Sequence, residues 1–209
     1  MEADTYLTLA APATGTYTDR RSKFIALAYP VRTLQEVKAR LDACQKQYYD
    51  ARHICYAYML GAERKDFRAN DNGEPSGTAG RPILGQINSM GLTNVLIVVV
   101  RYFGGIKLGT GGLVVAYRAA AAAALAEGQV VERTVDEVFS IRFPYPQMNE
   151  VMRIVREEGP DILSQGYDNA CLMTLRIRRS GLTRLQARLA KVDALQMVGE
   201  GEEGAQSAE

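Results

Sequence analysis

The spacing of apolar residues predicts that the chain begins with a strand and a helix. Residues 22–31, SKFIALAYPV, are rich in apolar and aromatic side chains and predict a strand. Thr33 stands three residues before Glu36, which is the spacing of a capping box at a helix start. Apolar residues then recur at helical spacing up to about Tyr48. We therefore expect a helix over residues 33–48 that buries one stripe.

Three further elements are predicted before residue 128. Residues 53–60, HICYAYML, alternate like a strand, and the polar residues 61–80 show no period and predict a loop. A short helix is predicted within residues 82–90. Residues 94–103 are apolar at both alternating sets of positions, which indicates a strand buried on both faces. An alanine-rich helix is expected from about Leu113 to Gly128, because alanine is the strongest helix former.

The pattern restarts near Asp136. Strand, helix, strand, strand, helix and strand follow in that order, which is the ferredoxin-like βαββαβ arrangement. A tight turn is expected at Asp168 and Asn169, and Ser180 is expected to cap the last helix. The fold class is therefore α+β. The predicted divisions are an N-terminal domain over 1–135, a ferredoxin-like domain over 136–199 and a disordered acidic tail over 200–209.

Composition and charge set limits on the partners. The chain has 209 residues, of which 47% are hydrophobic and 23% charged, and its net charge is +1. A nucleic acid or an anionic membrane would therefore have to be met by a local patch. The first residues, MEADTYLTLA, do not resemble a secretory signal, and the apolar run Val95 to Val100 is too short to span a bilayer. We expect a cytoplasmic protein without a membrane partner.

Cysteine and histidine spacing gives little support to metal or covalent chemistry. Cys44, Cys55 and Cys171 are widely spaced and are expected to be buried thiols. The lone His53 lies on the same side of a strand as Cys55, but a nucleophilic pair requires a geometry that the sequence does not show. A structural histidine is the favoured interpretation. No metal and no cofactor are expected.

The first segment that could carry chemistry is NDNGEPSGTAGRP, residues 70–82. Its glycines allow left-handed turns, so that backbone amides could point into a shared concavity. The alternative is a rigid surface turn whose polar side chains satisfy nearby backbone groups. The candidate ligand-binding residues here are Asp71, Gly73, Glu74, Ser76, Thr78 and Arg81.

The second segment is RYFGGIKLGTGG, residues 101–112, where a strand ends, a glycine-rich loop follows and a helix begins. The free N–H groups of a helix start suit an anion. The phosphate-loop motif does not fit, because Leu108 follows Lys107, and the dinucleotide motif would need glycine in place of Val114. Glycines chosen for close helix–strand packing are an equal alternative. The candidates are Arg101, Tyr102, Gly104, Gly105, Lys107, Thr110 and Gly111.

These two segments, with RRSKFIA and DARHICYAY before them, closely resemble the signature of the IMPACT family and its bacterial YigZ branch. The resemblance covers roughly residues 15–128. At one position the family usually has aspartate and this chain has Asn72. The replacement of a carboxylate by an amide favours a turn-forming role at this position over metal binding or base catalysis.

The resemblance implies a fold and a cellular process. The first domain would fold like part of a small-subunit ribosomal protein and domain IV of elongation factor G, and the second like a later, ferredoxin-like domain of that factor. Eukaryotic relatives are translation regulators that restrain an amino-acid-starvation kinase by binding its activator. For this chain the resemblance implies a module linked to translation, with RNA or the ribosome as a suspected partner.

Three functions remain open at this stage. The leading hypothesis is a non-catalytic protein that binds RNA, the ribosome or a translation factor through a glycine-rich face, on which Arg81, Arg101, Lys107 and Arg118 would cluster. This hypothesis requires the two glycine-rich segments to lie on one face. The second is an enzyme or nucleotide binder for a small phosphorylated ligand, although no convincing set of metal ligands or general bases accompanies the loop. The third is a pure protein–protein adaptor.

Overall fold

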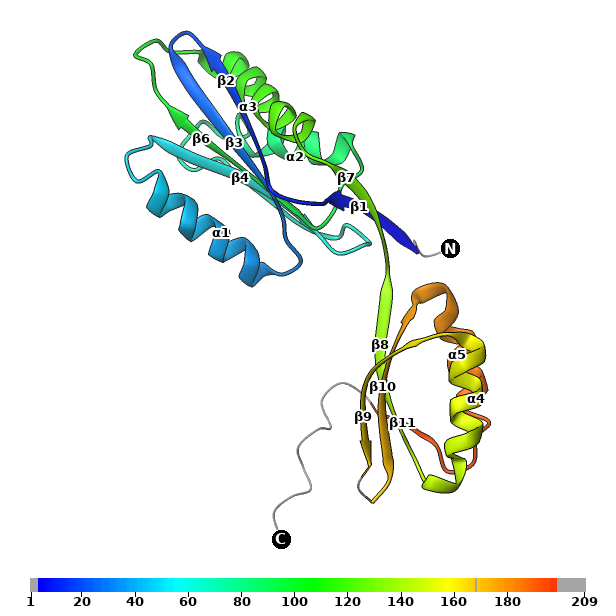
Figure 1. Ribbon diagram of the computed structural model, residues 1–209. Coiled ribbons are helices and arrows are strands. Elements are labelled where there is room, and N and C mark those ends of the chain that lie inside the picture. Colours follow the sequence, from blue (N-terminus) through cyan, green and yellow to red (C-terminus); the bar gives the residue numbers. More distant parts are fainter. Residues whose placement is uncertain (1–3, 168, 199–209) are drawn as a thin grey trace. The chain divides into compact units, whose positions relative to one another are not determined.

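The computed structural model describes residues 4–167 and 169–198 (Figure 1). The chain divides into two compact units between Arg133 and Thr134. Each unit has its own sheet and its own hydrophobic core. The mixed α and β composition predicted from the sequence is confirmed.

The first unit is built on a five-stranded antiparallel sheet with the strand order β2-β3-β6-β4-β5. The central strand, β6, is buried on both faces from Val95 to Val100, as its unbroken apolar sequence predicts. The strands of this sheet are β2 (Ala13–Asp19), β3 (Ser22–Pro30), β4 (His53–Leu60), β5 (Asp66–Asn70) and β6 (Val95–Tyr102).

Helices cover both faces of this sheet (Figure 1). Helix α1 (Leu34–Gln47) lies on one face, and α2 (Gly80–Ser89) and α3 (Gly109–Ala126) lie on the other. The backbone amide of Glu36 donates to the Thr33 hydroxyl at 3.2 Å, so Thr33 caps α1 as predicted. The two sides of the sheet therefore carry separate apolar layers.

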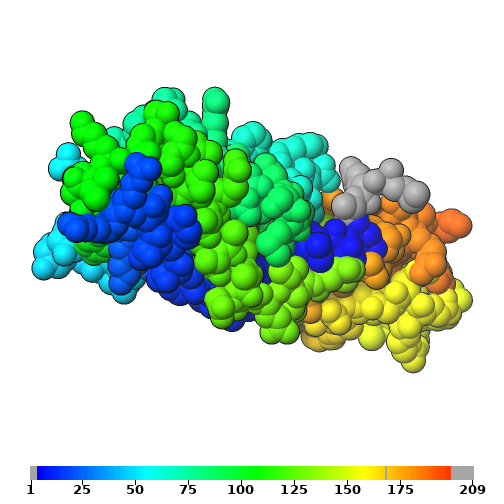
Figure 2. Space-filling model, turned by 90° about the horizontal axis from the view of Figure 1, so that it is seen from above, coloured from blue at the N-terminus to red at the C-terminus, as the bar shows by residue number. Residues whose placement is uncertain are grey.

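Helix α3 comes very close to the sheet because its inward side chains are small. A Cβ atom added to Gly15 of β2 would lie 2.2 Å from the backbone nitrogen of Ala124. Figure 2 shows the blue β2 segment beside the green α3 segment on the surface. Among the helices of the described residues, α3 alone has the length and composition to cross a membrane. Its buried residues pack against β2 and β3, as in the core helix of a globular unit.

The structure departs from the predicted elements in several places. The polar segment 61–80 is not a loop throughout, because β5 lies within it and pairs with β4. β5 escaped prediction because it is a short edge strand whose residues are mostly exposed. The strands β1 (Thr5–Leu9), β2 and β7 (Val130–Thr134) were also not predicted; β1 and β7 form a small separate sheet. Helix α3 begins at Gly109, before the expected Leu113, since the glycine-rich segment itself forms the first turn.

The second unit has the predicted order of strand, helix, strand, strand, helix and strand. Its antiparallel sheet has the strand order β11-β8-β10-β9, and α4 and α5 pack on one face. The predicted Ser180 cap is wrong, because α5 begins at Arg179 and Arg178 occupies the cap position. The expected turn at Asp168 and the tail over 200–209 lie outside the described residues. The elements are β8 (Asp136–Phe143), α4 (Met148–Glu158), β9 (Asp161–Tyr167), β10 (Cys171–Arg178), α5 (Arg179–Leu189) and β11 (Gln196–Val198), with a 3₁₀ turn at Tyr145–Gln147.

Candidate functional site

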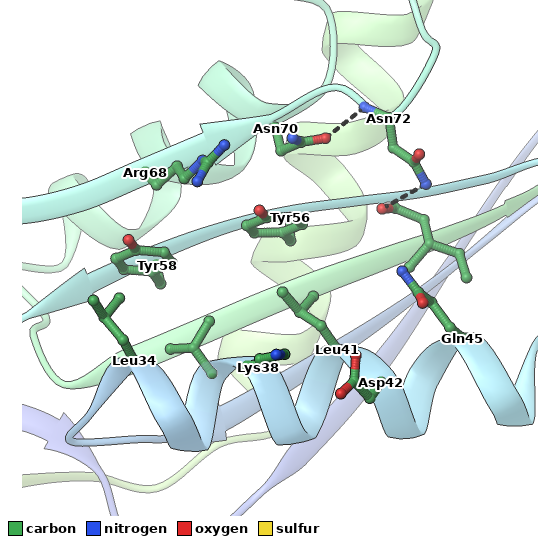
Figure 3. Close-up of a pocket in the computed structure, with 12 residues that line it drawn as sticks. Leu34, Lys38, Leu41, Asp42, Gln45, Tyr56, Tyr58, Arg68, Asn70 and Asn72 are labelled. Carbon is green, nitrogen blue, oxygen red and sulfur yellow. Dashed lines mark hydrogen bonds between the residues drawn. The ribbon is translucent and has the colours of Figure 1, made fainter.

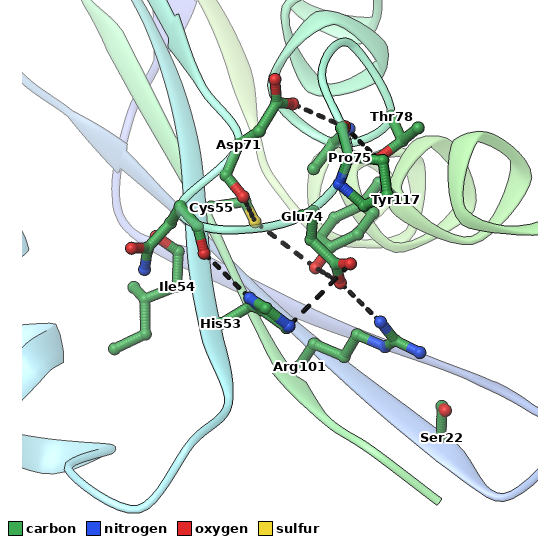
Figure 4. Close-up of polar contacts among 12 residues, drawn as sticks. Ser22, His53, Ile54, Cys55, Asp71, Glu74, Pro75, Thr78, Arg101 and Tyr117 are labelled. Atoms are coloured by element: carbon green, nitrogen blue, oxygen red, sulfur yellow. Dashed lines mark hydrogen bonds and ion pairs between the residues drawn. The ribbon is translucent and has the colours of Figure 1, made fainter. Parts of the chain in front are cut away.

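The two glycine-rich segments meet at a buried ion pair. Strand β5 returns the chain to the end of the sheet at which β6 finishes, so the loop over residues 71–80 lies beside the last residues of β6. There Oε1 of Glu74 accepts a hydrogen bond from Nη1 of Arg101 at 2.6 Å (Figure 4). The two side chains are only 4% and 6% exposed. The pair joins the two segments from inside the molecule.

Arg101 is held by aromatic rings as well as by Glu74. Its Cζ atom lies 5.5 Å from the ring centroids of both Phe24 and Phe103. Its Nε atom is buried and makes no hydrogen bond to any described residue. The prediction that Arg101 belongs to a surface cluster with Arg81, Lys107 and Arg118 is therefore wrong. Arg101 lies inside the fold and is not available to a partner, whereas Arg81, Lys107 and Arg118 are exposed.

Tyr117 of α3 connects the helix to the same carboxylate. Its hydroxyl donates to Oε1 of Glu74 at 2.8 Å, and the Cys55 thiol lies 3.4 Å from that hydroxyl and 3.0 Å from the carbonyl oxygen of Asp71. Burial raises the pKa of Cys55 to about 12 and also raises the pKa of Tyr117. Both groups stay protonated at neutral pH. The thiol is therefore unsuited to nucleophilic attack.

His53 closes the network on the solvent side. Its Nδ1 atom lies 2.8 Å from the carbonyl oxygen of Asn72, and its Nε2 atom lies 3.9 Å from Oε2 of Glu74. Because a carbonyl oxygen can only accept, Nδ1 carries a proton. The side chain is 15% exposed. These contacts fit the partly buried structural histidine expected from the sequence.

The side chain of Asp71 fixes the loop by accepting hydrogen bonds from backbone amides. Its carboxylate accepts hydrogen bonds from the amides of Gly77 at 2.8 Å, Ala79 at 3.0 Å and Gly80 at 2.8 Å. Burial disfavours the charged carboxylate, but these three amides together outweigh burial and lower the pKa of Asp71. Two of the amides belong to the start of α2, where a negative charge is favoured. Asp71 is therefore committed to the fold of the loop.

Asn72 occupies the turn position that its amide side chain favours. Its φ angle is +40°, in the left-handed region that asparagine tolerates better than most residues, and Gly73 follows with a φ of +82°. The Asn72 side chain donates through Nδ2 to the carbonyl oxygen of Ile54 at 3.0 Å. The backbone amide of Asn72 donates to Oδ1 of Asn70 at 2.8 Å. Asn72 thus holds the loop against β4.

The loop between β6 and α3 contains one glycine that allows close packing and others whose backbone is exposed. A Cβ atom on Gly104 would lie 2.1 Å from the carbonyl carbon of Arg21, so only glycine allows the loop to rest on the β2–β3 turn. Gly111 meets nothing within 4 Å and is exposed in the first turn of α3. That turn contains no acidic residue, and its cap position, Leu108, makes no side-chain cap hydrogen bond. Close packing therefore explains Gly104, whereas an anion site at the start of α3 stays a prediction.

The candidate ligand-binding residues differ widely in exposure. Tyr102 points to the sheet face that α1 covers, where its hydroxyl donates to Asp50 at 2.9 Å, and it takes no part in the Glu74 network. The Thr78 hydroxyl donates to the carbonyl oxygen of Pro75 at 2.7 Å. The exposed candidates are Gly73, Ser76, Arg81, Gly105, Lys107, Thr110 and Gly111; the half-buried ones are Asp71, Tyr102 and Gly104; and the buried ones are Glu74, Thr78 and Arg101.

Exposed cationic side chains gather around the end of the sheet near Gly104. We define the basic end by Arg20, Arg21, Lys23, Arg52 and Lys107, all of which are exposed. These residues come together through the backbone: Arg20 donates to the carbonyl oxygen of Lys107 at 3.5 Å, Lys23 pairs with Tyr102 across β3 and β6, and the Arg52 amide donates to the carbonyl oxygen of Arg101 at 3.2 Å.

The arginines of the β2–β3 turn adopt an unfavourable backbone conformation. Arg20 and Arg21 have φ angles of +43° and +64°, which glycine, asparagine or aspartate would adopt at lower cost. The turn nevertheless presents two arginine side chains to solvent. The sequence alone does not identify the basic end, because its members come from three separate segments.

Sequence reasoning also missed Tyr117 and the commitment of Cys55 to the network. One signal was available for Tyr117, which is the only aromatic residue within the alanine-rich segment 109–126. A buried tyrosine hydroxyl needs a partner, and here the partner is a buried carboxylate. Within the described ranges, no group of three or more His, Cys, Asp or Glu side chains could hold a metal ion.

Comparisons with known proteins agree with the resemblance seen in the sequence. The family model of the Impact N-terminal domain matches residues 20–125. The IMPACT family member YigZ of Escherichia coli (strain K12) is 31% identical over 189 residues, which cover 90% of this chain and 93% of that relative.

Two solved structures are also similar. A crystal structure of a hypothetical protein is 30% identical, covers 96% of this chain and 100% of its own, and superposes with a TM-score of 0.73. A structure described as the two-domain translational regulator Yih1 is 26% identical over 58% of this chain and 47% of its own, with a TM-score of 0.34, which supports no conclusion about the fold. The likeness to a ribosomal protein and to elongation factor G stays a prediction. From the family model and the bacterial relative, the chain belongs to the IMPACT family.

Proposed function

We propose that this chain is a translation-associated binding protein that contacts RNA through its basic end. The main support is that the five exposed cationic residues of the basic end lie together at one end of a sheet, although the net charge of the protein is only +1. These residues are Arg20, Arg21, Lys23, Arg52 and Lys107. The nearby carboxylates are Asp19 and Asp50, and Asp50 already accepts a hydrogen bond from Tyr102. An exposed excess of positive charge is the local patch that a phosphate backbone requires.

The buried network supports binding in preference to catalysis. Glu74 is paired with Arg101 and Tyr117, and the raised pKa of Cys55, about 12, keeps its thiol protonated. A general base or nucleophile has to reach a reacting atom, whereas these groups are used by one another inside the fold. Their arrangement stabilises the loop that lies beside the basic end.

Family membership supports the link to translation. The family resemblance implies that eukaryotic relatives regulate translation, and one relative of known structure is described as a translational regulator. Ribosomal RNA is therefore the RNA with which the proposal is tested. A protein partner in place of RNA is an outcome that the same experiment distinguishes.

The test is co-sedimentation with ribosomes and anisotropy titration of a fluorescent ribosomal RNA fragment over a range of salt concentrations. The double variant Arg21→Gln, Lys107→Gln removes two exposed charges that make no hydrogen bond or ion pair to other described side chains. We expect weaker binding and a plot of log K against log salt that is shallower by about 1.5, because each phosphate contact adds roughly 0.7–0.9 to the slope.

The matched control is the double variant Arg32→Gln, Arg133→Gln, which removes the same charge from exposed positions that line a different pocket. The control should bind as the wild type does. If both double variants weakened RNA binding equally, the effect would come from net charge and not from the basic end, which would contradict the proposal. Binding that resists nuclease and ignores salt would contradict RNA contact and favour a protein adaptor.

A further inference from the structure

A groove opens on the sheet face that carries α1. Helix α1 packs against β4 and β6, and residues of β4 and of the edge strand β5 line a groove beside it. The groove between α1 and these strands has a volume of about 410 Å³ (Figure 3). Pockets of this size hold small molecules in many proteins.

The floor of the groove is aromatic. Tyr56 and Tyr58 are two residues apart on β4, so their side chains point to the same face, and Figure 3 shows their rings side by side. Leu34 and Leu41 of α1 form the opposite wall, and Leu34 is 54% exposed although it is a large apolar side chain. A flat aromatic ring beside an aliphatic wall accommodates a planar ring between them.

The rim of the groove is polar and carries more positive than negative charge. Lys38 and Gln45 project from α1, and Arg68 and Asn70 from β5 (Figure 3). The side chains of Lys38, Gln45 and Arg68 make no hydrogen bond or ion pair to any residue that the structure describes. The Asn70 side chain accepts one hydrogen bond at Oδ1, from the backbone amide of Asn72, and its NH₂ group donates to no described residue. The one carboxylate in the lining is that of Asp42.

We propose that this groove binds a nucleotide. The base would stack on Tyr56, the side-chain amides of Gln45 and Asn70 would read its edge, and Arg68 with Lys38 would hold its phosphate. A purely apolar peptide would leave these polar groups without partners, which opposes that occupant. The shared chemistry has two sources, a free mononucleotide or one unit of a single-stranded RNA. The proposal goes beyond the RNA contact at the basic end and does not depend on it.

The experiment titrates the full chain with the four ribonucleoside monophosphates, the matching nucleosides and a single-stranded RNA hexamer, followed by amide chemical shifts and calorimetry. Tyr56→Leu removes the stacking ring and should weaken nucleotide binding at least about fivefold. Tyr56→Phe keeps the ring and should retain binding. Arg68→Gln, at an exposed position, should abolish the preference for a monophosphate over its nucleoside.

Each outcome decides the proposal. Mononucleotide binding that is lost in Tyr56→Leu supports a free nucleotide, and hexamer binding alone with the same loss supports a unit of RNA. No saturable binding of either ligand, or binding that Tyr56→Leu and Arg68→Gln leave unchanged, overturns it. Urea unfolding verifies that Tyr56→Leu remains folded, and the exposed Arg68→Gln is a second test if it does not.

The double variant Arg21→Gln, Lys107→Gln separates this proposal from the one on the basic end. Mononucleotide binding should survive in that variant, because its substitutions lie outside the groove lining. Loss of mononucleotide binding there would overturn the assignment to the groove. Loss of ribosomal RNA binding alone concerns only the basic end.

Discussion

Glu74 and Arg101 belong to the two glycine-rich segments, yet the structure uses them as internal supports. Their side chains are almost completely buried, and the carboxylate accepts from both Arg101 and the hydroxyl of Tyr117. A buried ion pair contributes little net stability compared with apolar residues of the same size, but removal of one partner leaves an uncompensated buried charge. Substitution at either position therefore tests folding before it tests binding.

The first prediction concerns this pair. Glu74→Ala should lower the free energy of unfolding by about 3–5 kcal/mol, because Arg101 would remain buried without a counter-charge. Urea denaturation measures the change. The double variant Glu74→Leu, Arg101→Met should lose less than the sum of the two single variants. Simple additivity in this cycle would contradict a direct interaction.

The second prediction concerns Asp71 and pH. Because the three amide hydrogen bonds lower its pKa, the group stabilises the fold fully above its ordinary pKa of 3.8, and this stabilisation is lost as the pH falls through the lower value of the folded state. Asp71→Asn should therefore be less stable than the wild type at pH 7, and the difference should shrink as the solution is acidified below pH 4.

Urea midpoints of the wild type and Asp71→Asn, measured from pH 7 down to pH 3, check this dependence. Asp42→Asn is the matched control, since the Asp42 carboxylate lies on α1 and has no hydrogen bond or ion pair to another described residue. A stability difference between the wild type and Asp71→Asn that stays constant over the whole range would show that the amide contacts do not act through ionisation.

At the scale of elements, the glycine-rich loop and the β2–β3 turn depend on one another. Gly104 rests directly on the backbone of Arg21, and its own amide donates to the Ser22 hydroxyl at 3.3 Å. The turn and the loop thus fix each other's position, and both supply residues of the basic end. The helix start that follows carries Gly111, which no neighbouring atom restricts.

The third prediction compares these two glycines. Gly104→Ala should destabilise the protein by about 1–3 kcal/mol, because its Cβ would overlap the Arg21 backbone and the loop would have to shift. Gly111→Ala should leave stability unchanged or raise it by up to about 1 kcal/mol, since alanine restricts the unfolded chain and meets open space. Thermal unfolding of both variants measures the contrast. Equal melting temperatures would refute the packing role of Gly104.

At the scale of the whole molecule, the two units have separate cores. The apolar residues of the second unit come from its own helices and from the facing side of its own sheet. Strand β8 lies between β10 and β11, so it is essential to that sheet. A unit of this size can fold alone, although with a small margin of stability.

The fourth prediction is that a fragment that starts at Thr134 folds by itself. It should give a dispersed amide spectrum and one cooperative urea transition, because its core is complete. A shorter fragment that starts at Ile141 loses most of β8 and should be unfolded. An unfolded spectrum for the longer fragment would show that the second unit requires the first.

Much of the fold could be predicted from local patterns in the sequence. The Thr33 cap, the two-sided burial of β6 and the order of elements after Asp136 are confirmed. These features depend on residues a few positions apart, whose periodicity and capping chemistry are visible in the sequence. The glycine-rich segments were recognised for the same reason, although exposed and buried members could not be separated.

Only the tertiary structure decided how these segments are used. Glu74 and Arg101 are 27 residues apart in sequence and meet because β5 pairs with β4 and returns the chain. The basic end and the groove likewise join residues from several elements. Such contacts depend on the path of the chain, since the same local patterns are compatible with different strand pairings. The sequence therefore determined the elements, and the strand pairing decided which side chains meet.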